Sequence, residues 1–193
     1  MSLLPEFELG LWNAWILVIP MVIILFFENR VVPARESSVE KKGLEYLTKK
    51  ERRTLNAMLF TMFASFVYAI FLPLQLGTAW FFPGLIIYLF GFFFTTTAIL
   101  NFASTPKNEL VTKGLYRISR NPMNIGWLMT QIGMSVACIS WLYLMLTVVL
   151  MILINATTPS EERWCLETYG DPYREYMSRT PKWIGIPKSE KRG

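Results

Sequence analysis

The sequence predicts an all-α integral membrane protein with about five transmembrane helices. Hydrophobic residues make up 53% of the 193 residues, and only 17% are charged, whereas roughly 25% are charged in typical soluble domains. Three long stretches, residues 9–27, 54–106 and 121–160, contain no charged residue. Since one helical crossing of a bilayer takes about 20 residues, these stretches are long enough for several spans. We expect residues 1–193 to form a single membrane domain.

The lengths of these stretches set the expected number of spans. The first has 19 residues and fits one span, and the second has 53 and fits two, with the turn in residues 73–83. As one straight helix, the third would be roughly 60 Å long, twice the thickness of the hydrocarbon core. We therefore expect two short spans there, with a reversal near residues 138–141. The expected spans are residues 11–27, 55–74, 82–102, 123–138 and 141–157.

The positions of the basic residues give an independent criterion for the number of spans. All 19 lysines and arginines fall within residues 28–54, 104–124 and 155–193. Five spans place all of them on one side of the membrane, whereas four spans place those after residue 155 on the opposite side. Because positive charge favours the cytoplasmic side, we expect five spans, an N-terminus outside, and a cytoplasmic C-terminus and active site. The net charge of +5 then indicates membrane lipids as partners, not nucleic acid.

The residues that are absent exclude several kinds of chemistry. The chain has no histidine, which excludes a histidine base, a Ser-His pair and a histidine metal site. Its two cysteines, Cys138 and Cys165, are too few for a four-thiolate zinc site, and we interpret both as small buried apolar residues. We expect no metal. No ionisable residue lies inside an expected span, which disfavours an ion pump. The polar segments 104–124 and 158–183 are therefore expected to form a catalytic region at the cytoplasmic face.

Segment 104–124 contains a predicted helix start. The pair Asn121-Pro122 indicates a turn followed by a helix with proline in its first turn, so Asn121 is the expected N-cap of the fourth span. Exposed amides at that helix start, with Arg117 and Arg120 nearby, would suit an anionic group such as a carboxylate. A basic loop that contacts lipid headgroups is the alternative.

Segment 158–183 contains a predicted helix below the last span. Residues 160–163 resemble a first helical turn that is rich in acidic residues. Arg163 and Glu167 lie four residues apart on one face, as in an ordinary surface salt bridge. The helix is expected to end at Gly170. After Gly170, three large side chains recur at every third residue: Tyr173, Tyr176 and Arg179. This spacing is more typical of helix packing than of a binding site.

Four motifs occur in order across residues 106–183. They are Leu110-Val111-Thr112-x-Gly114-x-Tyr116, Arg120-Asn121-Pro122-x-x-x-Gly126, Glu161-Glu162, and Tyr169-Gly170-x-x-Tyr173-x-x-Tyr176-x-x-Arg179-x-Pro181. Together they resemble isoprenylcysteine carboxyl methyltransferase, in a wider group that includes phospholipid methyltransferases. The family pattern has histidine at the position of Asn121 and often tyrosine at that of Asn124.

The resemblance implies S-adenosylmethionine as the methyl donor and S-adenosylhomocysteine as the product. A soluble methyltransferase would carry a glycine-rich loop after a strand, and this chain has none. A donor site would therefore be built from helix ends and loops at the membrane face. The donor-binding residues that the resemblance implies are Asn108, Glu109, Leu110, Val111, Tyr116, Asn121, Pro122, Met123, Asn124 and Glu162.

The resemblance also implies the carboxylate of a prenylcysteine-type lipid as the acceptor, entering from the bilayer. Methyl transfer from a sulfonium to a carboxylate neutralises two opposite charges, so a dry site favours it and no base is needed. We expect Arg163 to bind the carboxylate through its guanidinium fork and Glu167 to orient Arg163, which makes these two residues the catalytic candidates.

Two other functions remain open from the sequence. One is a phospholipid N-methyltransferase, whose amine acceptor must lose a proton to a carboxylate of the chain. The other is a non-enzymatic small membrane protein, either a permeation protein for small solutes or an assembly factor. Binding of S-adenosylhomocysteine separates the enzymes from the non-enzymatic proteins.

Overall fold

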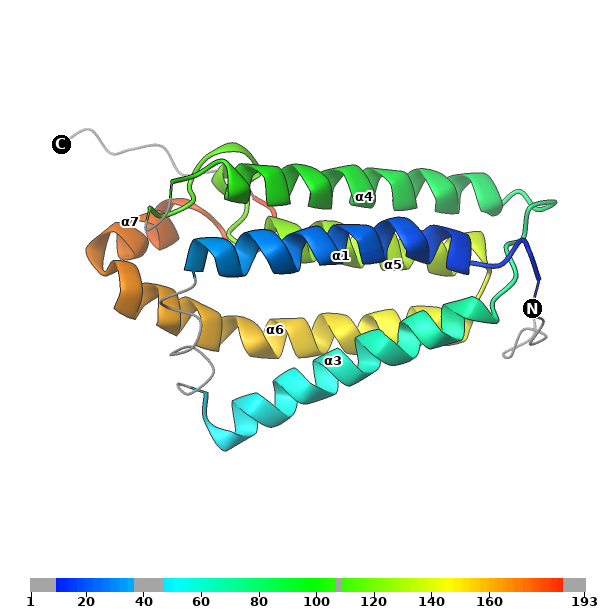
Figure 1. Cartoon of the computed structure of the whole chain (residues 1–193), viewed down its shortest axis with the longest axis horizontal. Helices are drawn as coiled ribbons and strands as arrows, with labels where there is room; N and C mark the ends of the chain where they lie inside the picture. The colour runs from blue at the N-terminus through cyan, green and yellow to red at the C-terminus, as the bar shows by residue number, and fades with distance from the viewer. Residues whose placement is uncertain (1–9, 37–46, 107–108, 186–193) are drawn as a thin grey trace.

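The computed structural model describes residues 10–36, 47–106 and 109–185, which form a bundle of helices (Figure 1). No β-strand occurs in these ranges, so the predicted all-α class is confirmed. The helices are α1 (Trp15–Glu36), α3 (Lys49–Ile70), α4 (Phe81–Ala103), the 3-10 helix η1 (Gly114–Arg117), α5 (Pro122–Ala137), α6 (Trp141–Tyr169) and α7 (Asp171–Arg179).

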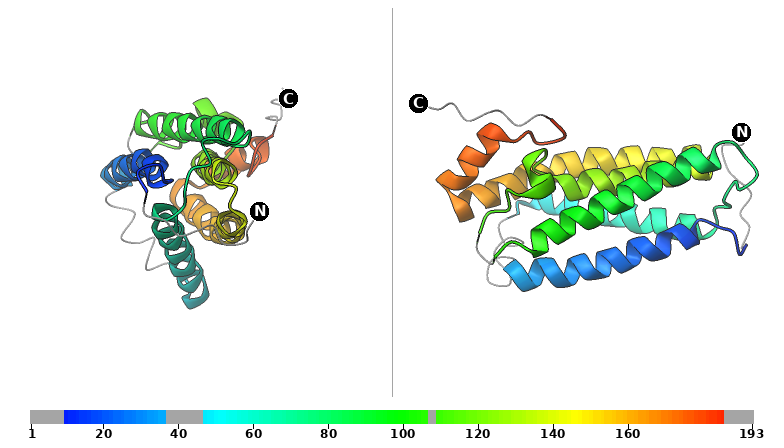
Figure 2. Two further views of the ribbon diagram at one scale, coloured as in Figure 1. Left: turned by 90° about the vertical axis from the view of Figure 1, so that its right-hand side faces the viewer. Right: turned by 90° about the horizontal axis from the view of Figure 1, so that it is seen from above.

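The five long helices run side by side, with successive helices in opposite directions (Figure 2). Helix α5 packs against both α4 and α6, and most of its residues are buried. Helix α3 packs along α6 and diverges from the bundle toward its own N-terminal end (Figure 1). Loop 104–121, α7 and the charged end of α6 therefore lie at one end of the bundle.

Glycines allow α4 and α5 to approach closely. A Cβ atom at Gly133 would lie 2.3 Å from the backbone nitrogen of Tyr88, and one at Gly126 would lie 2.3 Å from Thr95 Oγ1. Small residues at such a crossing bring two helix backbones together, which is a common device in membrane proteins. The close contact fixes the start of α5, where Asn121 and Pro122 lie, against α4.

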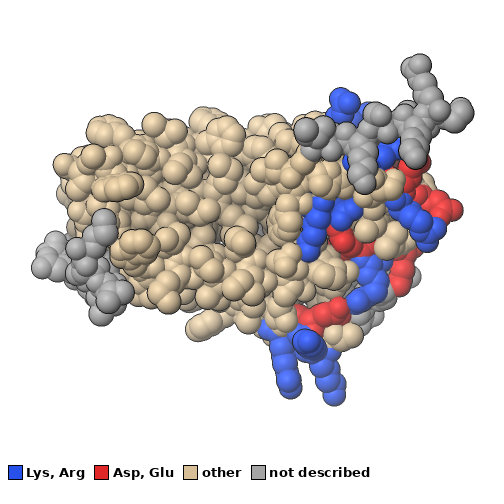
Figure 3. Space-filling view, turned by 180° about the vertical axis from the view of Figure 1, so that it is seen from behind, with Lys and Arg blue, Asp and Glu red and all other residues tan. Residues whose placement is uncertain are grey.

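The distribution of charge is that of an integral membrane protein. By length and composition, α3, α4 and α6 are long and apolar enough to cross a membrane, and the apolar part of α1 is the shorter segment Trp15–Glu28. Large hydrophobic side chains such as Phe60, Phe93 and Ile152 are exposed along the bundle. Charged side chains gather at one end of the molecule (Figure 3). The five expected spans overlap α1, α3, α4, α5 and α6, and their orientation in the membrane stays a prediction.

One predicted element is wrong. Residues 160–163 do not begin a new helix, because α6 continues from Trp141 to Tyr169 with Pro159 inside it. A helix of 29 residues is about 44 Å long, whereas the hydrocarbon core is about 30 Å thick. The last turns of α6 therefore extend beyond the apolar part of the bundle. The helix ends where expected, at Gly170, whose φ of 62° is readily adopted by glycine.

Candidate active site

A cavity of about 530 Å³ opens at the charged end of the bundle, a size in the usual range for small-molecule sites. Its wall is formed by residues of α1, α3, α4, α6 and α7 and by residues within 110–124. Segments that are far apart in the sequence therefore meet around one space.

Most of the sequence-predicted donor residues lie on this wall. They are Leu110, Val111, Tyr116, Asn121, Pro122, Met123, Asn124 and Glu162. Glu109 is exposed and is not part of the wall, and Asn108 lies outside the described residues. The fold thus brings residues of loop 110–124 against Glu162 of α6, which the resemblance had placed in one site.

Arg120 and Glu162 join these two parts of the wall. Arg120 Nη2 lies 2.7 Å from Glu162 Oε1, and Arg120 Nη1 donates a hydrogen bond to the Met177 carbonyl at 3.0 Å. Both side chains are largely buried, with exposed fractions of 11% and 18%. Within the described part of the chain, Arg120 Nε has no hydrogen-bond partner, whereas Glu162 Oε1 is held in the ion pair with Arg120. The pair is therefore incompletely satisfied and can accept further polar contacts.

Arg163 binds a different carboxylate. Its Nη2 lies 3.0 Å from both carboxylate oxygens of Glu51, at the start of α3. Glu51 also accepts hydrogen bonds from the backbone N–H and hydroxyl of Thr48, and these bonds, followed by Arg163, lower the pKa of the Glu51 carboxyl. Glu51 lies on the cavity wall, whereas Arg163 and Glu167 do not. The catalytic roles of Arg163 and Glu167 stay predictions.

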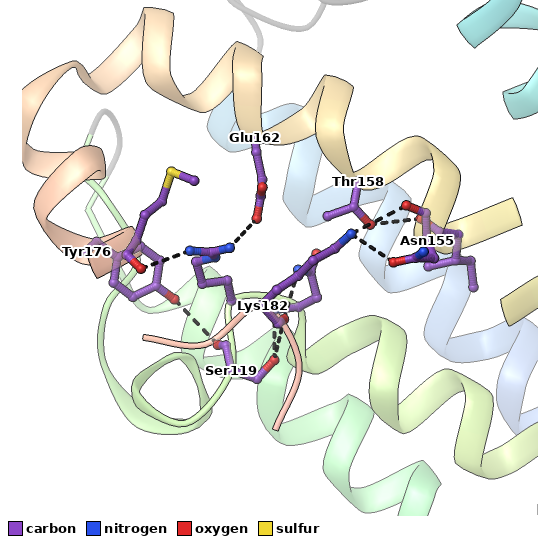
Figure 4. Close-up of polar contacts among 10 residues, drawn as sticks. Ser119, Asn155, Thr158, Glu162, Tyr176 and Lys182 are labelled. Carbon is purple, nitrogen blue, oxygen red and sulfur yellow. Dashed lines mark hydrogen bonds and ion pairs between the residues drawn. The ribbon is translucent and has the colours of Figure 1, made fainter. Parts of the chain in front are cut away.

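Asn121 occupies the predicted N-cap position of α5, with Pro122 in the first turn. Its side chain does not cap the helix, however, because its Nδ2 donates to the Lys182 carbonyl at 3.1 Å. Ser119 Oγ accepts the backbone N–H of Asn121 at 2.9 Å and donates to the same Lys182 carbonyl at 3.3 Å (Figure 4). The segment after α7 therefore holds the turn that begins α5.

Helix α7 contributes two tyrosines that the sequence analysis interpreted as packing residues. Tyr173 and Tyr176 are buried and line the cavity. The Tyr176 hydroxyl donates to the Tyr116 carbonyl at 2.7 Å and so ties α7 to η1. Burial raises the pKa of both phenols above the ordinary value, so both stay protonated near neutral pH. Their spacing of three residues in the family motif was the sequence signal that both tyrosines lie on one face of a helix.

A sequence model described as phospholipid methyltransferase matches residues 75–172, which is half of the chain. The chain belongs to the phospholipid methyltransferase family. No curated protein matches the chain. The match runs from the connection before α4 to the first residues of α7 and contains most of the cavity wall. Methyltransferases of this family generally use S-adenosylmethionine. The isoprenylcysteine enzymes that the motifs resemble are related membrane methyltransferases, and the match is not specific to them.

This phospholipid methyltransferase family member also carries wall residues that the sequence analysis did not assign to a site. They include the carboxylates Glu28, Glu51 and Glu161, together with Trp164, Cys165 and Tyr169. Glu161 was visible in the Glu161-Glu162 doublet, and Glu28 is the first charged residue after the first apolar stretch. Of the two cysteines, Cys138 is buried as expected, whereas Cys165 is partly exposed on the wall.

Proposed function

We propose that this membrane methyltransferase transfers a methyl group from S-adenosylmethionine to the amine headgroup of a phospholipid at the cytoplasmic face. The charge of the cavity wall is the observation that carries the proposal. Four carboxylates, Glu28, Glu51, Glu161 and Glu162, face one arginine among the described wall residues, Arg120, which is paired with Glu162. A negatively charged concave site attracts both the donor sulfonium and a lipid ammonium.

A prenylcysteine carboxylate, the acceptor implied by the motif resemblance, fits this wall less well. Arg163, the expected carboxylate ligand, is held by both oxygens of Glu51. Arg120 is held by Glu162. A carboxylate acceptor would have to open one of these ion pairs and would approach uncompensated carboxylates. Like charges in a partly buried site repel one another, so an ammonium is the better match.

The donor half of the proposal rests on the Arg120–Glu162 pair. The amino-acid end of S-adenosylmethionine carries one carboxylate and one ammonium, which complement a guanidinium and a carboxylate. The buried Arg120 Nε lacks a hydrogen-bond partner within the described residues. A polar group of the donor would satisfy it. Asn121 and Asn124 lie at the start of α5 on the same wall, so the amino-acid end is expected between α5 and α6.

The acceptor is expected to enter from the bilayer between α1, α3 and α6. Apolar wall residues at this side are Leu47 and Leu55. Carrying an acyl chain through water would cost about 0.8 kcal/mol for each CH₂ group, so lateral entry leaves the chains in the membrane while the headgroup reaches the cavity.

Two measurements on detergent-purified protein test the proposal. Calorimetry should detect binding of S-adenosylhomocysteine. Labelled S-adenosylmethionine should then pass its methyl group to phosphatidylethanolamine in mixed micelles, with a prenylcysteine assayed beside it. Transfer to the prenylcysteine alone would overturn the amine acceptor. Failure to bind S-adenosylhomocysteine would overturn the enzymatic function and favour a non-enzymatic membrane protein.

A further inference from the structure

Two of the four wall carboxylates form no ion pair with a described residue. Glu51 is held by Arg163 and Glu162 by Arg120. Glu28 of α1 and Glu161 of α6 form no hydrogen bond or ion pair with any described residue. Carboxylates without partners in a concave, partly desolvated site are unfavourable unless the ligand supplies the partner. They come from two different helices and line one cavity, which can therefore take a cationic group.

We propose that Glu161 is the base that removes a proton from the acceptor ammonium, and that Glu28 holds this ammonium from the side of α1. This assignment rests on the proposed amine acceptor. Glu161 directly precedes Glu162, the residue assigned to the donor, and both line the same cavity as Glu28 of α1. A base on this wall shares the cavity with the nitrogen that must attack the donor methyl group.

Few other wall residues can act as the base, because Glu51 and Glu162 are held in ion pairs and only Glu161 and Glu28 remain among the wall carboxylates. The chain has no histidine, and Asn121, at the position of the family histidine, cannot carry a proton at neutral pH. Tyr173 and Tyr176 stay protonated because burial raises their pKa. Desolvation and the neighbouring charge of Glu162 raise the pKa of Glu161, so its carboxylate holds a proton better than an ordinary glutamate. Glu161 lies on a concave wall, where protein atoms surround its carboxyl, yet the residue stays accessible to solvent, so the proton can leave to water.

The step balances in atoms and charge. The acceptor R–NH₃⁺ gives one proton to the Glu161 carboxylate and becomes R–NH₂. The nitrogen lone pair forms a bond to the methyl carbon of S-adenosylmethionine while the carbon–sulfur bond breaks, and its electron pair stays on sulfur. The products are R–NH₂CH₃⁺ and neutral S-adenosylhomocysteine. The neutral carboxyl of Glu161 then releases its proton to water.

Several charged groups act on Glu161 and will shape its titration. Glu162 on the same helix raises its pKa, whereas Lys182, after α7, lowers it. The remaining ionisable wall residues come from the neighbouring elements: Glu28 on α1, Glu51 on α3, Arg120 before α5, Cys165 on α6, and Tyr116, Tyr169, Tyr173 and Tyr176. A second carboxylate variant is therefore needed to assign a change in the pH profile to Glu161.

Glu161→Gln tests the assignment, with Glu28→Gln as the second variant and Glu175→Gln as the matched control. Glu175 is an exposed carboxylate on α7 that pairs with Arg179, away from the cavity wall. General-base catalysis contributes about 100-fold or more, so Glu161→Gln should lower kcat on phosphatidylethanolamine by that factor. Binding of S-adenosylhomocysteine should stay within twofold. Glu28→Gln should instead raise the KM for the lipid several-fold.

The pH profile separates a base from a residue that only shapes the cavity. Amines of this type deprotonate unaided near pH 10, so raising the pH to about 10 should restore much of the Glu161→Gln rate relative to wild type. If Glu161→Gln keeps near-wild-type turnover at neutral pH, or if it loses S-adenosylhomocysteine binding, Glu161 is not the base, while the proposed function stands. A wild-type protein that methylates only a carboxylate lipid would instead overturn the proposed function, and the base with it.

Discussion

Lys182 lies against Asn155 of α6, where Pro159 interrupts the hydrogen bonds of the helix. Lys182 Nζ donates to Asn155 Oδ1 at 2.9 Å and to the Asn155 carbonyl at 3.4 Å (Figure 4). A helical residue 159 would normally donate its N–H to the carbonyl of residue 155, and proline has no N–H. The Lys182 ammonium therefore supplies a donor that Pro159 removes. The same residue's carbonyl accepts Asn121 Nδ2, so Lys182 connects the break in α6 to the start of α5.

The first prediction concerns this connection. Lys182→Met should lower the stability of the purified protein by about 0.5–1.5 kcal/mol, because the hydrogen bonds from a charged donor to the exposed Asn155 are lost. Thermal unfolding in detergent measures the loss. Lys50→Met, at the exposed start of α3, is the matched control and should change stability by less than about 0.5 kcal/mol.

Pro159→Ala gives a second check on the same relationship. Alanine restores a backbone donor for Asn155, so Lys182→Met should cost less in a Pro159→Ala background than in the wild type. Equal effects of Lys182→Met in both backgrounds would show that the lysine does not compensate for the proline.

The second prediction concerns the donor site. Glu162→Gln should weaken binding of S-adenosylhomocysteine by tenfold or more, which is about 1.4 kcal/mol or above. The amide keeps the shape of the side chain but loses the charge that faces Arg120 and the donor ammonium. Calorimetry on the folded variant measures the change, with Glu175→Gln again as the control. Unchanged affinity in a folded variant would exclude Glu162 from the donor site.

The third prediction distinguishes the two acceptors through Arg163. This side chain is 41% exposed and pairs with Glu51, a geometry in which ion pairs contribute less than about 1 kcal/mol. For an amine acceptor, Arg163→Lys should therefore keep turnover within a few-fold of wild type. A carboxylate acceptor that needs the planar guanidinium fork would instead lose most of its turnover with donor affinity intact. Methyl transfer to each lipid, measured for both proteins, decides between these outcomes.

Local signals in the sequence were sufficient for the fold class and for much of the cavity wall. Long charge-free stretches predict membrane helices, and Asn121-Pro122 marks the start of α5 because proline fits the first turn of a helix. The motif resemblance placed Glu162 of α6 in the same site as residues before α5. The structure shows that Glu162 and these residues line one cavity.

The contacts that the sequence did not predict depend on residues far apart in the chain. Arg163 has a carboxylate four residues away at Glu167, yet the structure pairs it with Glu51, 112 residues away, because α3 packs on α6. Pro159 lies inside α6, and Lys182, 23 residues later in the chain, donates to the Asn155 carbonyl that faces the proline. Glu28 belongs to the site only because the end of α1 reaches the cavity. Such contacts form only when the helices pack together, so local sequence patterns do not predict them.

The fourth prediction concerns orientation in the membrane. Five spans place all 19 basic residues on one side, so residues 28–54 and 155–193 should both be cytoplasmic. With Cys138 and Cys165 removed, single cysteines at Ser38 and Ser189 should resist an impermeant thiol reagent applied to intact cells. A cysteine at Ala79, in the exposed connection between α3 and α4 at the opposite end of the bundle, should react and serves as the positive control. Labelling at Ser38 or Ser189 in intact cells would contradict the five-span arrangement, because it would place basic segments outside.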